Sequence, residues 1–110
     1  MKRIVLAVAL VTALAVALPA IAATPVYTGT DGPGFTIKMA RQPTTAGTIK
    51  LVISDKSNAH NFHLTGPGVN VKTGVSTVGT KTFTVTLKKG VYKFICDPHA
   101  SFMKGSFTVK

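Results

Sequence analysis

The chain of 110 residues contains one cysteine, three acidic residues and no tryptophan. A single cysteine cannot form a disulfide within the chain, so Cys96 is an intermolecular link, a free thiol or a metal ligand. Internal repeats and low-complexity segments are absent as well, and beyond the N-terminal segment no long stretch repeats its apolar residues at a helical period. These absences exclude a disulfide scaffold, a repeat protein and a helical bundle.

The shortage of acidic residues leaves the chain strongly basic, with 13 lysines and arginines and a formal net charge of +10. The basic residues are spaced singly and are not grouped with aromatic residues, so the sequence does not favour nucleic-acid binding. An acidic partner protein or an anionic membrane surface fits this charge better, because such a field speeds encounter without specifying a fold.

The N-terminal segment has the organisation of a signal peptide. Basic residues at positions 2 and 3 precede an apolar run over residues 4–18, and residues 19–22 supply a site of small residues for cleavage. The run is shorter than the roughly 20 residues that a spanning helix needs, which disfavours a retained membrane anchor. We therefore expect residues 1–22 to be removed, residues 23–110 to form one domain, and the protein to be periplasmic or secreted. Without Lys2 and Arg3, 11 basic residues remain against three acidic ones, a formal charge of +8.

The rest of the chain reads as short strands separated by turn residues. Alternating apolar and polar residues predict strands over residues 25–30, 35–40, 48–54, 60–65, 81–87, 91–95 and 105–110. Between residues 66 and 79 we expect a loop with at most one short edge strand. In the strand at 35–40, Phe35 and Met39 would face inward. Strands at this spacing predict an all-β sandwich of about seven or eight strands.

The residues with metal-binding chemistry are concentrated after the strand at 91–95, where Cys96, His99 and Met103 fall within eight positions. Thiolate, imidazole and thioether suit copper, and a blue-copper site consists of two histidines, a cysteine and a weak axial methionine. A structural zinc site prefers four strong ligands. Spacing also allows a single helical turn from 98 to 103, with Asp97 as its cap.

The second histidine has two candidates, His60 and His63. On an alternating strand, His60 faces the core together with Phe62 and Leu64, whereas His63 faces outward. This pattern favours His60 as the ligand and leaves the role of His63 open.

The motif Cys96-x2-His99-x3-Met103, together with His60-Asn61 upstream, resembles the cupredoxins, the small blue copper proteins that include plastocyanin and azurin. The resemblance covers nearly all of the chain after the signal peptide. It implies a Greek-key sandwich that holds one type 1 copper ion through His60, Cys96, His99 and the axial Met103. It also implies that Asn61 ties its strand to the cysteine loop, and that the protein is a one-electron carrier rather than an enzyme.

Other functions remain possible on the sequence alone. A copper-storage or copper-delivery protein would use the same four ligands. A thiol enzyme with Cys96 as nucleophile and His99 as base lacks an orienting third group, and a metal-free structural sandwich is the least specific alternative. With three acidic residues the chain cannot present an acidic docking surface, so we expect a redox partner that carries one. We expect a monomer without nucleic acid and without stable membrane insertion after cleavage.

Overall fold

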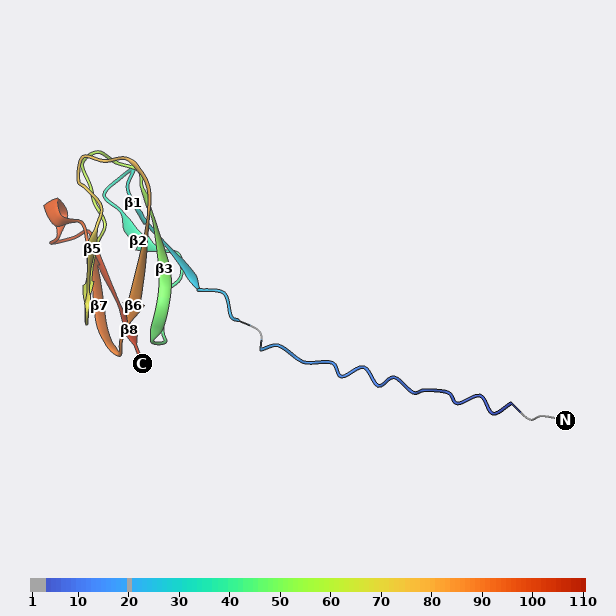
Figure 1. Cartoon of the computed structure of the whole chain (residues 1–110). Coiled ribbons are helices and arrows are strands. Elements are labelled where there is room, and N and C mark those ends of the chain that lie inside the picture. Colours follow the sequence, from blue (N-terminus) through green and yellow to red (C-terminus); the bar gives the residue numbers. More distant parts are fainter. Residues whose placement is uncertain (1–3, 20) are drawn as a thin grey trace.

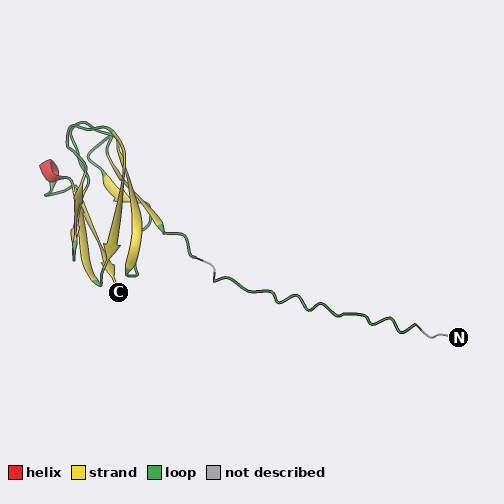
Figure 2. Cartoon of the chain, viewed as in Figure 1, coloured by secondary structure: helices red, strands yellow, loops and turns green. Residues whose placement is uncertain are grey.

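Two four-stranded sheets pack face to face in this computed structural model, which describes residues 4–19 and 21–110 (Figures 1 and 2). The first sheet contains β1 (Val26–Asp31), β2 (Ile37–Met39), β3 (Gly47–Asp55) and β6 (Gly79–Leu87), in the order β2-β1-β3-β6. The second contains β4 (His63–Gly66), β5 (Val69–Lys72), β7 (Gly90–Ile95) and β8 (Lys104–Val109), in the order β5-β4-β7-β8. The predicted β-sandwich is confirmed, and the uncertain segment after residue 66 contains the edge strand β5.

All neighbouring strands are antiparallel except β1 and β3, which run in parallel. The chain crosses from β3 in the first sheet to β4 in the second, and returns to the first sheet at β6. The loops 56–62 and 73–78 carry these two crossings, whereas the loop 96–103 joins the neighbouring strands β7 and β8 within the second sheet. The candidate metal ligands lie on the loops 56–62 and 96–103.

Aromatic side chains fill much of the space between the sheets. Phe62 stacks on Phe94 with ring centroids 5.4 Å apart, and Tyr92 stacks on Phe107 at 5.2 Å. Such pairs add to the free energy of burial, which is about 25 cal/mol for each Å² of apolar surface removed from water. The strand face that ends at Cys96 is buried as its alternation predicts, because Tyr92, Phe94 and Cys96 are 0%, 3% and 0% exposed.

Two glycines allow these rings to lie directly on neighbouring backbone. A Cβ atom at Gly66 would come within 2.2 Å of the Tyr92 ring, and one at Gly105 within 2.2 Å of the Phe94 ring. Both glycines lie against side chains of β7, the strand that Cys96 follows directly. Close packing of the aromatic rings therefore holds β7 in place and fixes the direction in which the Cys96 side chain points.

Two predicted strand boundaries are wrong. β2 begins at Ile37, and Phe35 lies in the preceding loop with 66% of its surface exposed rather than facing the core. β4 begins at His63, so His60 lies in a loop although Phe62 and Leu64 are buried as predicted. Ahead of β4 the alternation extends beyond the first backbone pairing because His60 and Phe62 of the loop are also buried. Ahead of β2 the same alternation does not report burial, since Phe35 is exposed.

The N-terminal segment extends away from the sandwich (Figure 1). Residues 4–19 and 21–25 contain no helix or strand, and their side chains are exposed. Among the described residues, no helix has the length and apolar character needed to cross a membrane. The signal peptide over residues 1–22 remains a prediction, and its positions 1–3 and 20 lie outside the described residues.

Candidate metal centre

Three of the predicted ligands meet at one end of the sandwich. His60 comes from the loop between β3 and β4, Cys96 follows β7 directly, and His99 ends the short 3-10 helix Asp97–His99. Cys96 is fully buried and His60 is nearly so, whereas His99 is partly exposed. The centre therefore lies just below the surface, with the His99 imidazole at its outer edge.

The donor atoms of these three side chains form a small triangle. His60 Nδ1 lies 3.1 Å from His99 Nδ1, and Cys96 Sγ lies 3.7 Å and 3.5 Å from the two nitrogens respectively. A point in their plane is about 2.0 Å from all three atoms, close to ordinary metal bond lengths to imidazole nitrogen and thiolate sulfur. Among the described residues, these three side chains are positioned to hold a metal ion.

The donor set fits copper. Unprotonated imidazole nitrogens and a thiolate at these separations repel one another, and a cation between them would remove this repulsion. Two histidines and one cysteine in a trigonal plane are the strong ligands of a blue-copper site.

Backbone hydrogen bonds fold the loop between β7 and β8 back on itself. The His99 N–H donates to Cys96 O at 3.0 Å, the Met103 N–H to His99 O at 2.8 Å, and the Cys96 N–H to Met103 O at 3.0 Å. Pro98 fits the first turn of the helix because its missing N–H would have no partner there. The loop thus returns Met103, whose side chain is 1% exposed, to the strand end that carries Cys96.

Asn61 ties the His60 loop to the cysteine loop, as the resemblance implies. Its Oδ1 accepts the Asp97 N–H at 2.7 Å, and its Nδ2 donates to Asp97 Oδ2 at 2.7 Å and to Thr73 O at 3.3 Å. The residue is 1% exposed, so these bonds satisfy an amide that burial would otherwise penalise. The expected tie is confirmed.

Asp97 does not cap the short helix as predicted. The capping position is occupied by Cys96, without a side-chain hydrogen bond, and Asp97 is the first helical residue. Partial burial raises the pKa of Asp97, but hydrogen bonds from His63 and Asn61, together with the charges of His63 and Lys72, outweigh burial and lower the pKa overall. The Asp97 carboxylate therefore binds side chains of the loop before β4 and of β4 itself, rather than an N–H group of its own helix.

Strand alternation predicts that His63 faces outward, but the structure leaves little of its side chain exposed to solvent. Its side chain is 17% exposed and its Nδ1 lies 2.8 Å from Asp97 Oδ1. The alternation placed it correctly on the opposite face from Phe62 and Leu64, but that face is covered here by the cysteine loop.

Two phenylalanines surround the imidazoles at the surface. The Phe35 ring lies 5.3 Å from the His60 ring and 5.1 Å from the His99 ring, and Phe102 lies 5.5 Å from His99. The two phenylalanines also contact each other, with centroids 5.7 Å apart. The sequence pattern misplaced Phe35 in a strand, although its position directly after Gly32, Pro33 and Gly34 is a sign of a loop residue.

The fold and the centre together define a class of protein. An eight-stranded sandwich with two histidines and one cysteine converging from loops at one end is the arrangement of a cupredoxin. The family model of copper binding proteins of the plastocyanin/azurin family matches residues 31–110. The chain belongs to this family, and its cofactor is copper.

Solved structures support the same fold. Reduced rusticyanin is 24% identical, with a TM-score of 0.61 over 79% of this chain and 79% of its own. Auracyanin from the photosynthetic bacterium Roseiflexus castenholzii, reduced with Na-dithionite, is 21% identical, with a TM-score of 0.54 over 81% of this chain and 98% of its own. No curated protein matches the chain.

Proposed function

We propose that this protein is an exported one-electron carrier, with copper held by His60, Cys96 and His99 and with Met103 as a weak axial ligand. The observation that carries the proposal is the triangle of donor atoms, closed to within 3.7 Å by loops that hydrogen bonds of Asn61 and of the backbone hold together. Copper held by these residues would supply the one-electron chemistry, because both Cu(II) and Cu(I) are accessible to it.

The surrounding residues restrict how far the ligands move when the charge changes. The Asn61 side chain holds the backbone after Cys96, and the backbone bonds within the loop hold His99 and Met103 relative to Cys96. A site fixed in one geometry needs little rearrangement on electron transfer. This favours a carrier over a storage protein, which must open to release its metal.

The electron would enter and leave at the His99 edge. Phe35 and Phe102, which flank this imidazole, are 66% and 57% exposed and give an apolar contact surface. Of the three acidic side chains, Asp31 and Asp55 are buried, so Asp97 has the one partly exposed side-chain carboxylate in the described chain. The basic surface fits a redox partner with an acidic docking surface, which it would attract at a distance.

Reversible reduction without loss of metal tests the carrier role. We expect the copper-loaded protein to be reduced and reoxidised through many cycles in voltammetry, in the presence of a Cu(I) chelator, with its visible band fully recovered. Reduction that transfers copper to the chelator within one cycle would instead indicate storage or delivery. Titration of the metal-free protein with copper, followed by the visible band, gives the stoichiometry, which we expect to be one copper per chain.

The axial role of Met103 has a separate test. Met103→Leu keeps the side-chain volume but removes the sulfur, so the protein should fold and retain its blue colour. An apolar group in place of the thioether disfavours Cu(II), and the reduction potential should rise by about 60 mV or more, a tenfold change in relative affinity for a one-electron couple. Met39→Leu, at the buried methionine of β2, is the matched control and should leave the potential unchanged. An unchanged potential in Met103→Leu would remove Met103 from the ligand set.

A further inference from the structure

The third histidine of the chain has both ring nitrogens engaged away from the metal centre. His63 Nδ1 lies 2.8 Å from Asp97 Oδ1, and its Nε2 lies 2.7 Å from Asn70 Oδ1. Because an ionised carboxylate can only accept, the Nδ1 atom donates to Asp97. His63 begins β4 and Asn70 lies on β5, so the imidazole bridges from this edge of the second sheet to the cysteine loop.

Asp97 is consequently held at three points. One carboxylate oxygen accepts from His63, the other accepts from Asn61 Nδ2 at 2.7 Å, and the backbone N–H donates to Asn61 Oδ1 at 2.7 Å. Without His63, the carboxylate would keep the Asn61 bond alone and could rotate toward solvent, since its side chain is 36% exposed. The His63 bond therefore removes the remaining freedom of this residue.

Asp97 is well placed to affect the metal centre because its peptide bond follows Cys96 directly. The Cys96 carbonyl accepts the His99 N–H at 3.0 Å, so the peptide between Cys96 and Asp97 belongs to the turn that presents both side chains. A small rotation of this peptide would redirect the thiolate relative to the two imidazoles.

We propose that His63 is a positioning residue for the metal centre, which holds the cysteine loop against β4 and β5 through Asp97 and so fixes the direction of the Cys96 thiolate without binding the metal. This inference rests on the proposed ligand set of His60, Cys96 and His99. Partners that orient metal ligands in this way typically change metal affinity 10- to 100-fold when they are removed.

The test replaces His63 in the copper-loaded protein and measures the visible spectrum, the reduction potential and the copper affinity. His63→Phe removes both hydrogen bonds and should weaken copper binding about 10- to 100-fold. It should also shift the charge-transfer band and the potential while one copper per chain is still bound. His63→Gln can still donate to Asp97 and should restore most of the wild-type affinity and spectrum.

Controls separate a failure of this inference from a failure of the ligand set. Thr65→Ala, two positions along the same face of β4, should match the wild type. His60→Ala should abolish the blue band; if it does not, the ligand set is wrong. If His63→Phe abolishes the band whereas His60→Ala keeps it, His63 is a ligand. If His63→Phe leaves the spectrum, the potential and the affinity unchanged, His63 has no positioning role. Either result overturns the proposal.

A second route covers the case in which His63→Phe does not fold. Asp97→Asn leaves a single amide oxygen for the two donors that the carboxylate oxygens now serve, and we expect it to give the same spectral shift and loss of affinity. The double variant of His63→Ala and Asp97→Asn should be little worse than Asp97→Asn alone, because His63→Ala also removes the contact with Asp97 and both changes act through that one contact. Fully additive losses would contradict the proposed path through Asp97.

Discussion

Cys96→Ser should abolish the intense visible absorption of the copper-loaded protein completely. A serine oxygen is a hard donor, and only the thiolate sulfur gives the strong charge-transfer transition of a blue-copper site. The replacement is nearly isosteric at a position that is fully buried and lies 3.5 to 3.7 Å from the two imidazole nitrogens. The measurement is an absorption spectrum of the two proteins at equal copper loading.

The copper affinity of Cys96→Ser should also fall sharply, because the two histidines alone leave a weaker and harder donor set. Ser101→Ala, at an exposed hydroxyl of the same loop, is the control and should retain the full band. An intense band that persisted in Cys96→Ser would mean that the metal is held elsewhere, and the geometry around His60 and His99 would need another explanation.

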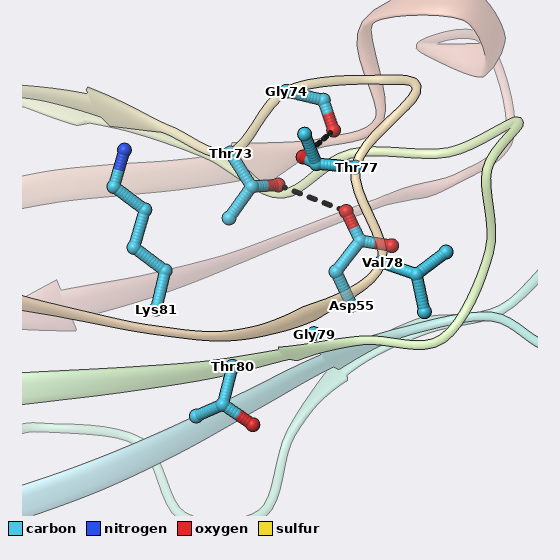
Figure 3. Close-up of a pocket in the computed structure, with 8 residues that line it drawn as sticks. All are labelled: Asp55, Thr73, Gly74, Thr77, Val78, Gly79, Thr80 and Lys81. Atoms are coloured by element: carbon cyan, nitrogen blue, oxygen red, sulfur yellow. Dashed lines mark hydrogen bonds between the residues drawn. The ribbon is translucent and has the colours of Figure 1, made fainter.

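The stability of the protein should decrease as the pH rises from about 4 to about 7. The parallel register of β1 and β3 places Asp31 beside Asp55 at the ends of the two strands, where they are 0% and 3% exposed. Asp55 accepts from Thr73 Oγ1 at 3.3 Å at the edge of an open surface pocket (Figure 3) and from the Ser57 N–H at 3.1 Å. Neither oxygen of Asp31 has a hydrogen-bond partner within the described residues.

The direction of this pH dependence follows from the proton that Asp31 retains in the folded protein. Burial, and then the neighbouring Asp55 carboxyl, raise the pKa of Asp31 from 3.8 to about 7. Between these values the folded protein binds more protons than the unfolded chain, so each pH unit of increase lowers the free energy of unfolding by up to about 1.4 kcal/mol. This loss of stability is complete above the pKa of Asp31 in the folded protein. Asp97, with a lowered pKa, acts in the opposite direction, and its contribution is lost only in more acidic solution.

Asp31→Asn isolates this effect, because the asparagine stays neutral at every pH and all other titratable side chains are unchanged. The variant should be more stable than the wild type at pH 8 by on the order of 3 kcal/mol, and the difference should shrink toward pH 4. Urea unfolding of both metal-free proteins at several pH values measures it. A difference that stays constant with pH would show that Asp31 is ionised throughout.

Local patterns in the sequence were sufficient to predict the sandwich and most of the copper site. Alternation reports which residues of a strand are buried, and this placed Tyr92, Phe94 and Cys96 correctly. The spacing of Cys96, His99 and Met103 lies within one short loop, so their proximity needs no long-range folding. His60 and Asn61 were found through the cupredoxin resemblance and an alternation that continued beyond the strand.

The tertiary structure alone decided the contacts between segments far apart in the chain. Asp31 meets Asp55 because β1 and β3 pair in one register, and His63 reaches Asp97 because β4 lies next to β7. Phe35 packs on the imidazoles from a loop, although in the sequence it alternates with polar residues as the first residue of a strand would. A periodic pattern describes how each segment is buried, but the choice of partner depends on strand register and loop packing, which are set by the free energy of the whole sandwich.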